Sequence, residues 1–535
     1  MDFGEAVQWW EEWQLRILVQ ASSQPLPPVF PIHHCRLAED WQPAFPICSL
    51  LDRRSQNTYG HRQASTLAVD MAMAATTPDH PAGATSSSPP PRVRVHDTSL
   101  VQPSPSPPET SLPLTFFDII WLHSPPVERL FFYRLAADAD VSAILSNLKA
   151  SMHQAVLAFY PLAGRIRLTP GTSDRYELCY TPGDAVTFTV AESDDDADID
   201  GLAADEPREV TKLATLVPSL PEGGGLLALQ ATVLSERRGL AIGVTVHHAA
   251  CDGSGSTHFL HTWAAACIGA GEAKRPAPPV IDRSLLGDKR GMYDVFVQAP
   301  PSTDEMEFVK MSDDQLFATF TLSTDDLRRV KGVVADEAAR RGAAPPPRCS
   351  SLVATLGFAW SCYQRAKEGG RVVVSGSGEN KPMTCLLFPV DHRSRMKPPL
   401  PEKYFGNCVG PAFGVAPKVE LAEGGAGGVS SPHEAVREIG TPGMDTWLDR
   451  IREVSAMGLL SVAGSPRFRV YEMDFGFGRP AKVDIVSVAR TGAVAVAESR
   501  SGTGGMEVGV SLQPDGMETF RKCFADGIAW LHQRS

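Results

Sequence analysis

The stretch VTVHHAACDG, Val244–Gly253, places two adjacent histidines, a cysteine and an aspartate close together. An imidazole can accept a proton near neutral pH, a thiol can act as a nucleophile, and histidines with a carboxylate can bind a metal ion. The spacing from His248 to Asp252 also places a carboxylate where it can cap a helix or hold a loop. The choice among these chemistries depends on where the local elements direct each side chain.

The two histidines follow LAIGVTV, an alternating run that predicts a β-strand, and the preceding LLALQATVL and SERRG predict its hairpin partner and the connection. Because side chains alternate along a strand, Ile242 and Val244 share an apolar face that His248 continues, and His247 points the other way. A desolvated imidazole stays neutral. We therefore expect His248 to be the residue that accepts a proton.

Three other interpretations of this stretch remain open. A histidine at a strand end is commonly a hydrogen-bonded core residue, and HxxxD strings also arise by chance. A metal site would need His247, His248, Asp252 and His258, but histidines on opposite faces do not converge without a bulge, so we predict no metal. A Cys251 nucleophile lacks a third group to orient its base.

A second string, YEMDFGFGRP, lies more than two hundred residues later. Asp474 precedes an aromatic residue, Phe477, that stands between Gly476 and Gly478. Two glycines in this arrangement indicate a tight backbone bend with an aromatic anchor. The Asp-Phe-Gly letters do not indicate a kinase, because the chain lacks the HRD loop and the Gly-rich phosphate loop.

Composition narrows the possible functions. The chain has 535 residues, of which 43% are hydrophobic and 21% charged, typical of a soluble globular protein with at least two domains. A net charge of -12 argues against nucleic acid as a partner. The 10 cysteines form no CxxC pair, so neither zinc nor a disulfide framework is expected. Without a long apolar run or a signal peptide, we expect a cytoplasmic protein that does not enter membranes.

The segments that flank the two strings predict alternating helices and strands. Residues 1–90 read as a disordered or non-native extension ending in the linker-like TSSSPPPRVRV, with the fold beginning near Arg92. Apolar residues from Val141 to Val156 recur at helical spacing, and a similar stripe follows Asp252. In the second half, SLVATLGFAWSC and METFRKCFADGIAWLHQ predict helices, and RVVVS and TCLLFPV predict strands. The pattern indicates an α/β or α+β fold.

Taken together, HHAACDG and DFGFG resemble the HxxxD and DFGWG motifs of the plant BAHD acyltransferases. LPLTFFD, YPLAGR, DHRSR and YFGNC add to the resemblance, which extends from about Arg92 to the C-terminus. The string YFGNC resembles the branch that acylates glucosides of anthocyanins and other phenolics, commonly with malonyl-CoA.

The resemblance implies a two-domain fold like that of chloramphenicol acetyltransferase, with a solvent channel between the domains. The first domain would span residues 91–290 and carry HxxxD. A crossover linker over residues 291–310, near DRSLLGDKRGMYDVFVQAP, would lead to a second domain at 311–535 that carries YFGNC and DFGFG, with some chain exchange between the two. The family also implies a monomer.

The resemblance further implies a reaction. His248 would act as the general base that takes a proton from an acceptor hydroxyl while its oxygen attacks the thioester of an acyl-CoA. No covalent acyl-enzyme and no tightly bound cofactor would be needed. The expected partners are acyl-CoA, most commonly malonyl-CoA, and a hydroxylated phenolic glucoside. The alternative is transfer from acetyl- or hydroxycinnamoyl-CoA to another alcohol or amine acceptor.

Roles for other residues also follow from the resemblance. Asp252, beside Gly253, would pair with Arg393 and hold the loop. Asp474, with Gly476, Phe477 and Gly478, would shape the CoA channel, or Asp474 would serve as a second catalytic group. The candidates for contacts with CoA are Ser350, Ser351 and Arg500.

Two departures from the family pattern affect the substrate prediction. Phe477 stands where the motif usually has Trp, which removes an indole N–H donor. The residues after HxxxD, SGSTH, offer no cation for a malonyl carboxylate. These departures weaken the malonyl prediction and leave acyl transfer untouched.

Two alternative functions also remain: a peptide-synthetase condensation domain, which shares the HHxxxDG letters, and a non-catalytic binding protein on the same fold.

Overall fold

The computed structural model describes most of the chain from β1 onward, namely residues 93–193, 198–235, 238–271, 274–297, 312–340, 349–367, 382–422, 454 and 457–533. The predicted extension 1–90, the strand predicted at RVVVS and most of the crossover predicted at 291–310 lie outside these residues. All described residues belong to one compact unit of the chain.

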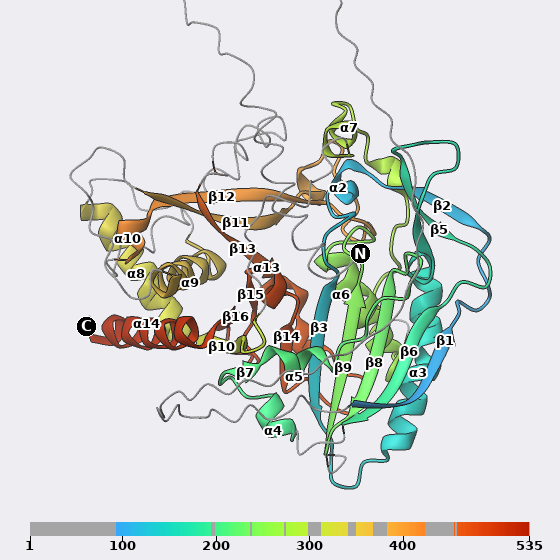
Figure 1. Ribbon diagram of the computed structural model, residues 1–535, viewed down its shortest axis with the longest axis horizontal. Helices are drawn as coiled ribbons and strands as arrows, with labels where there is room; N and C mark the ends of the chain where they lie inside the picture. Colours follow the sequence, from blue (N-terminus) through green and yellow to red (C-terminus); the bar gives the residue numbers. More distant parts are fainter. Residues whose placement is uncertain are drawn as a thin grey trace, which may run out of the picture. The chain divides into compact units, whose positions relative to one another are not determined.

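One six-stranded sheet carries the HHAACDG stretch (Figure 1). Its neighbouring strands are antiparallel except for β6 and β8, which are parallel. The predicted hairpin is confirmed as β8 and β9. In spatial order the strands are β1 (Val93–Val101), β6 (Val186–Ser193), β8 (Leu227–Val233), β9 (Gly239–Val246), β3 (Val127–Arg134) and β14 (Lys482–Ile485).

A seven-stranded sheet is built mainly from the second half of the chain. Its strands, in spatial order, are β12 (Val409–Pro417), β11 (Met383–Asp391), β13 (Gly458–Gly464), β15 (Val494–Glu498), β16 (Met506–Leu512), β10 (Leu316–Leu322) and β7 (Arg208–Glu209). β13 is parallel to both of its neighbours, and the other pairs are antiparallel. A three-stranded sheet consists of β2 (Thr110–Pro113), β5 (Tyr176–Tyr180) and β4 (Arg165–Leu168).

Two strands cross between the halves of the chain. β14 comes from the second half but pairs with β3 at the edge of the six-stranded sheet. β7 comes from the first half but pairs with β10 at the edge of the seven-stranded sheet. Each large sheet is therefore completed by the other half of the sequence.

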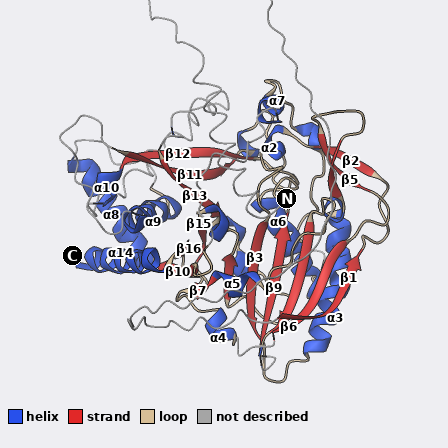
Figure 2. Ribbon diagram, in the orientation of Figure 1, coloured by secondary structure: helices blue, strands red, loops and turns tan. Residues whose placement is uncertain are grey.

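Two long helices cover the six-stranded sheet (Figure 2). They are α3 (Val141–Ala158) and α6 (Gly253–Cys267), both predicted from their apolar stripes. Met152 of α3 and Trp263 of α6 are fully buried in one hydrophobic core with Phe131 of β3 and Ile242 of β9. This core fixes the end of β9 against the start of α6, which is where HHAACDG lies.

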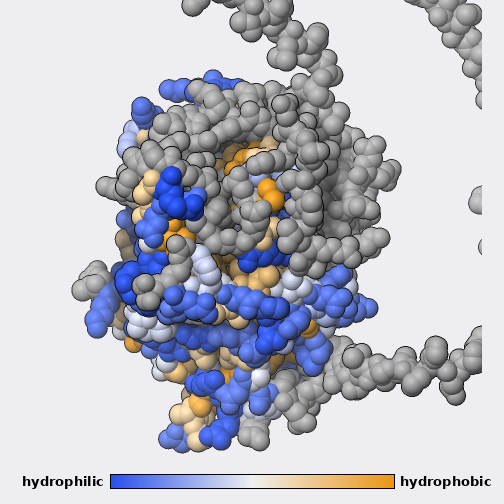
Figure 3. Space-filling view, turned by 90° about the vertical axis from the view of Figure 1, so that its left-hand side faces the viewer, coloured by the Kyte–Doolittle hydropathy of each residue, from blue (hydrophilic) through white to orange (hydrophobic). Residues whose placement is uncertain are grey.

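The seven-stranded sheet packs against α8 (Thr324–Arg340), α9 (Ser351–Lys367) and α14 (Pro514–Gln533). Val330, Trp360 and Phe520 from these helices are fully buried in a second core. Figure 3 views the molecule from this side, and much of the described surface there is hydrophilic, as amphipathic helices require. The helices predicted at SLVATLGFAWSC and METFRKCFADGIAWLHQ correspond to α9 and α14.

The remaining helices are short. Among the described residues, no helix is long and apolar enough to cross a bilayer. The short α-helices are α2 (Phe116–Ile119), α4 (Ile199–Leu202), α5 (Val210–Ala214), α7 (Met292–Val297), α10 (Lys418–Ala422) and α13 (Val488–Thr491), and the 3-10 helices are η1 (Tyr160–Ala163), η4 (Arg283–Leu285), η5 (Arg393–Arg395), η7 (Pro466–Phe468) and η8 (Val470–Glu472).

Candidate active site

The β8–β9 hairpin delivers the two histidines to the turn before α6. Ile242 lies in the core under α3 and α6, and Ala241 faces a different core on the opposite side of the sheet, so the predicted alternation of faces is confirmed. The His247 N–H donates to the Leu226 carbonyl at 2.9 Å and extends the strand pairing past β9. His248 is then the first residue after this pairing.

His248 is held by contacts to its ring and its backbone. The imidazole stacks on the indole of Trp121, with 3.9 Å between ring centroids and 11° between planes. The Asn407 side chain donates to the His248 carbonyl at 2.9 Å. Nδ1 is buried and has no hydrogen-bond partner among the described residues. Burial lowers the pKa of His248, so the ring is neutral near pH 7 and can accept a proton.

Neither a cysteine nucleophile nor a metal site is supported by this geometry. The Cys251 thiol is almost fully buried, and burial raises its pKa, so it stays protonated and is a poor nucleophile. His258 bonds to the Ala277 carbonyl at 2.7 Å rather than turning toward the other histidines. Within the part of the chain that the structure describes, no three His, Cys, Asp or Glu side chains gather as metal ligands.

Asp252 is fully engaged in holding the loop. Its carboxylate pairs with Arg393 at 2.9 Å, the ion pair expected from the sequence, and accepts the Cys408 backbone N–H at 3.0 Å. It also accepts the Gly255 N–H at 3.0 Å as the N-cap of α6. Arg393 in turn donates to the carbonyls of Tyr404 and Gly406. Asp252 therefore joins the HHAACDG turn to DHRSR and YFGNC.

Gly253 is required by close packing. A Cβ at this position would lie 2.6 Å from the ring of Phe468 in η7 and 3.3 Å from Nη2 of Arg129. Any larger residue would displace the Phe468 ring or the start of α6. The glycine thus lets α6 begin directly against η7.

A second buried carboxylate, Asp118, braces the same turn from the other side. It is fully buried, pairs with Arg283 and accepts the backbone and side-chain N–H groups of Asn407 at 2.9 and 3.0 Å. Arg283 also donates to the Ala250 carbonyl at 2.8 Å. Asn407 therefore connects Asp118 directly to the His248 carbonyl, and LPLTFFD and YFGNC meet at the histidine.

The DFGFG string forms the bend that the sequence predicts. Gly476 and Gly478 have φ values of 99° and 105°, in the region that favours glycine. The Asp474 carboxylate accepts their two N–H groups at 2.7 and 3.0 Å. The Phe477 ring meets the Tyr133 ring of β3 edge-on at 5.0 Å. These contacts favour the shaping role of Asp474 over the catalytic one.

The two roles of Asp474 make different predictions for the Asp474→Asn variant. An amide oxygen still accepts both N–H groups, so we expect kcat/KM for acyl transfer to stay within about threefold of wild type. Asp474→Ala removes the acceptor and should lower kcat/KM by roughly 10-fold. Steady-state kinetics of both variants provide the measurement. If the Asn variant is as inactive as the Ala variant, the negative charge takes part in catalysis.

The three candidates for CoA contacts lie apart from the histidine motif in sequence and have partners of their own. The Ser350 hydroxyl accepts the Val353 N–H at 3.2 Å at the start of α9, and the Ser351 hydroxyl accepts from Lys331 at 3.0 Å. Arg500 is paired with Glu507 at 2.9 Å and with Asp205. Ser351 and Lys331 together present a hydroxyl and a cation that could contact CoA. Arg500 is already paired with two carboxylates, so its charge is less available to CoA.

Sequence reasoning missed several residues that surround His248. They are Trp121, which stacks on its ring; Asp118, Arg283 and Asn407, which brace its turn; and Arg129, which donates to the Thr257 hydroxyl of α6. Asp118 and Asn407 could have been found from the strings LPLTFFD and YFGNC, which contain them. No local pattern in the sequence marks Trp121, Arg283 or Arg129.

Known proteins share both the sequence and the fold of this chain. The family model described as the Transferase family matches residues 92–526. Malonyl-CoA:anthocyanidin 5-O-glucoside-6''-O-malonyltransferase of Arabidopsis thaliana is 32% identical, over 81% of this chain and 98% of the relative. Phenolic glucoside malonyltransferase 1 of the same plant is 34% identical, over 82% and 98%.

The crystal structure of vinorine synthase has the same fold. It superposes with a TM-score of 0.58 at 21% identity and covers 80% of this chain and 96% of its own. The α/β architecture is that of chloramphenicol acetyltransferase, as the two motifs implied. With the family match over most of the described residues, these relatives establish that the chain belongs to the Transferase family, as one of the BAHD acyltransferases.

Proposed function

We propose that the protein transfers an acyl group from CoA to a hydroxyl group, with His248 as the general base. The observation that carries the proposal is the placement of His248, whose imidazole stacks on Trp121 and whose backbone carbonyl accepts from Asn407. Burial lowers the pKa of His248, which keeps the ring neutral near pH 7. A base that is already neutral and oriented needs no rearrangement before proton transfer.

The proposed step balances as follows. Nε2 of His248 takes the proton of the acceptor hydroxyl as its oxygen forms a bond to the thioester carbonyl carbon. The tetrahedral intermediate then collapses, the C–S bond breaks, and the proton returns from His248 to the sulfur. The products are an ester and CoA with a free thiol, and no acyl-enzyme forms.

The proposed donor is malonyl-CoA and the proposed acceptor is a phenolic or anthocyanin glucoside. Support comes from the names of the two malonyltransferase relatives, which match this chain over about four-fifths of its length. The YFGNC string supports the same branch, and its Asn407 holds the His248 carbonyl. Acetyl- and hydroxycinnamoyl-CoA are the competing donors, because Ser254 offers no cation after the HxxxD motif.

A competition assay with the purified full-length protein tests the proposal. Malonyl-, acetyl- and coumaroyl-CoA are offered together with a panel of flavonoid and simple phenolic glucosides. The products are identified from their masses by mass spectrometry. A glucoside that gains a malonyl mass supports the proposal in full. Transfer of another acyl group overturns the donor, and no transfer to any acceptor supports a non-catalytic binding protein.

The lowered pKa of His248 predicts the pH dependence of the reaction. Only the neutral ring accepts a proton, and burial lowers its pKa below the ordinary 6.5. We expect kcat/KM to stay level as the pH falls to 6.5 and to decrease only at lower pH. Initial rates measured between about pH 5 and 8 give the profile. A half-maximal point above 6.5 would contradict a base depressed by burial.

Three further features belong to the same proposal. CoA would run past the start of α9, where the Ser351 hydroxyl accepts from Lys331 and the Ser350 hydroxyl accepts the Val353 N–H. Residues 91–290 and 311–535 would act as two domains on either side of a substrate channel. The protein would work as a monomer in the cytoplasm, which fits the unpaired thiols of Cys251 and Cys408.

A further inference from the structure

The side-chain amide of Asn407 is fully buried beside the proposed base. Its nitrogen uses both of its hydrogens: Nδ2 donates to the Asp118 carboxylate at 3.0 Å and to the His248 carbonyl at 2.9 Å. Turning the amide over would break both bonds, so the positions of its oxygen and nitrogen are fixed. The amide oxygen Oδ1 is bonded to the same carbon as Nδ2, and it therefore also lies beside His248.

Two complementary polar atoms of Asn407 and His248 are left without a partner. Oδ1 of Asn407 is a buried acceptor that receives no hydrogen bond from the described residues. Nδ1 of His248 is buried and unpartnered in the same part of the chain. Buried polar atoms normally pair, and exceptions occur at catalytic sites. Because the two residues are already in contact, a bond between these atoms would satisfy both.

The two buried carboxylates that brace the turn have no free oxygen for the imidazole. Each oxygen of Asp252 accepts one bond from Arg393 and one from a backbone N–H. One oxygen of Asp118 accepts two bonds from Asn407, and the other pairs with Arg283. The ring therefore cannot be oriented by either carboxylate without breaking an existing contact.

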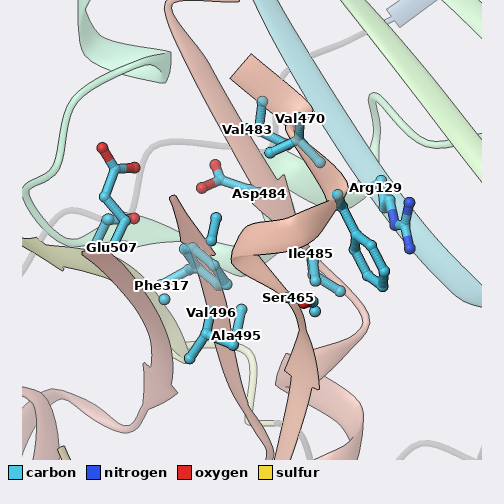
Figure 4. A pocket seen from close by; sticks show the side chains of 15 residues that line it. Arg129, Phe317, Ser465, Val470, Val483, Asp484, Ile485, Ala495, Val496 and Glu507 are labelled. Carbon is cyan, nitrogen blue, oxygen red and sulfur yellow. The ribbon is translucent and has the colours of Figure 1, made fainter. Parts of the chain in front are cut away.

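The pocket shown in Figure 4 offers no partner for Nδ1 either. Its lining includes Arg129, Ser465 and Glu507, and its volume of about 30 Å³ has room for about one water. Neither His248 nor Asn407 lines this pocket. A water bound there would not contact the imidazole, which leaves the Asn407 amide as the available acceptor.

The stack on Trp121 allows the imidazole to move in its own plane. The two rings are nearly parallel, with 11° between their planes, and an imidazole makes its hydrogen bonds in the ring plane. A small shift in that plane brings Nδ1 to Oδ1 and keeps the aromatic contact. Burial lowers the pKa of His248, and the Asn407 side chain works against that lowering, as a nearby acceptor does.

We propose that Asn407 is a positioning residue whose Oδ1 accepts the Nδ1–H of His248 and so fixes the tautomer in which Nε2 can take a proton. The inference rests on the proposed acyl transfer. A neutral imidazole carries one N–H, and a hydrogen on Nε2 would prevent that atom from accepting the hydroxyl proton.

The bond to Asn407 would also stabilise the protonated base. Once Nε2 has taken the proton, both ring nitrogens carry a hydrogen, and the one on Nδ1 stays bonded to Oδ1. The amide itself gains no proton. Asn407 would thus orient the histidine as the aspartate of a Ser-His-Asp triad does, and Asp118 would hold Asn407 in turn.

The tautomer is measured directly in the full-length protein with ¹⁵N-labelled histidine and no substrate. NMR of the ring nitrogens at neutral pH reports which nitrogen carries the hydrogen, and His248→Gln identifies the His248 signals by their loss. We expect the hydrogen on Nδ1 in the wild type, and on Nε2 or shared between both nitrogens in Asn407→Ala. A wild-type ring with its hydrogen on Nε2, or an Nδ1–H form that Asn407→Ala fully retains, would overturn the proposal.

Steady-state kinetics of Asn407→Ala separate positioning from substrate binding. The variant keeps the backbone N–H on Asp118 at 2.9 Å, so part of the brace persists while the histidine tautomer is released. We expect kcat to fall on the order of 10²-fold and KM for both substrates to stay within about threefold of wild type. A higher KM with unchanged kcat would contradict a positioning role.

Gln230→Ala is the matched control. Gln230 is a buried amide on β8, in the same sheet, and it donates to the Thr215 carbonyl at 3.2 Å and the Thr232 hydroxyl at 3.0 Å. Its loss should lower the melting temperature as Asn407→Ala does, but leave the tautomer unchanged and kcat within about twofold. Equal losses of kcat in the two variants would refute the proposal. Transfer by the wild-type protein decides the proposed function independently, since the tautomer is measured without turnover.

Discussion

Replacing His248 with alanine should lower kcat for acyl transfer by roughly 10³-fold while the protein remains folded. The variant removes the only proposed acceptor for the hydroxyl proton. It keeps the His248 carbonyl, so the hydrogen bond from Asn407 at 2.9 Å persists, although the stack on Trp121 is lost. Transfer to a glucoside is measured by mass spectrometry, and thermal melting confirms the fold.

His247→Ala is the matched control for this prediction. His247 is adjacent in sequence, and its Nδ1 accepts the Ala249 N–H at 3.2 Å. Burial lowers the pKa of His247 to about 4, so this ring is neutral as well. The His247 side chain, however, continues the opposite face of the strand from His248. We expect less than about a 10-fold loss of kcat for this variant. Unchanged turnover in His248→Ala would remove the general base from the mechanism.

Asp252→Ala should cause a large loss of stability. It leaves the Arg393 guanidinium buried without its principal counter-charge, since its second acid, Asp391, is half exposed and 3.2 Å away. Breaking a buried ion pair in this way costs about 3–5 kcal/mol. Chemical denaturation followed by tryptophan fluorescence gives the change in the free energy of unfolding.

The double variant Asp252→Leu with Arg393→Met separates the ion pair from the rest of the loop. Removing both charges avoids the uncompensated guanidinium, so the double variant should be more stable than Asp252→Ala. If Asp252 only positions the loop, residual activity in either variant should keep an acidic limb, moved to lower pH because the Asp252 charge otherwise raises the pKa of His248. A limb that disappears altogether would instead assign Asp252 a part in proton transfer.

Local sequence patterns predicted the elements that present the histidine. The alternation in β9 and the apolar stripes of α3 and α6 depend on neighbouring residues, so they can be read directly from the chain. The Asp252–Arg393 pair was identified through the family resemblance, because 141 residues separate the two side chains. The α/β or α+β class came from the alternation of predicted helices and strands, but the arrangement like that of chloramphenicol acetyltransferase came from the resemblance, since the order of strands in a sheet leaves no local signature.

The residues that complete the site could not be predicted in this way. Asn407 reaches the His248 carbonyl across 159 residues of chain, and Asp118 meets Asn407 across 289. Trp121 lies in the turns between α2 and β3, and Arg129 lies in β3, and neither stretch carries letters unusual for a buried strand and its approach. Their importance arises from which charges and rings the tertiary fold brings beside them.

The exchange of strands between the two large sheets affects how the chain folds during translation. The six-stranded sheet lacks its edge strand β14 until Ile485 has been synthesised, although its other strands are complete by Val246. The unprotected edge of β3 is therefore exposed through the translation of more than two hundred further residues. A nascent chain of this kind should need a chaperone to shield that edge, and separately expressed halves should become soluble only when they are produced together.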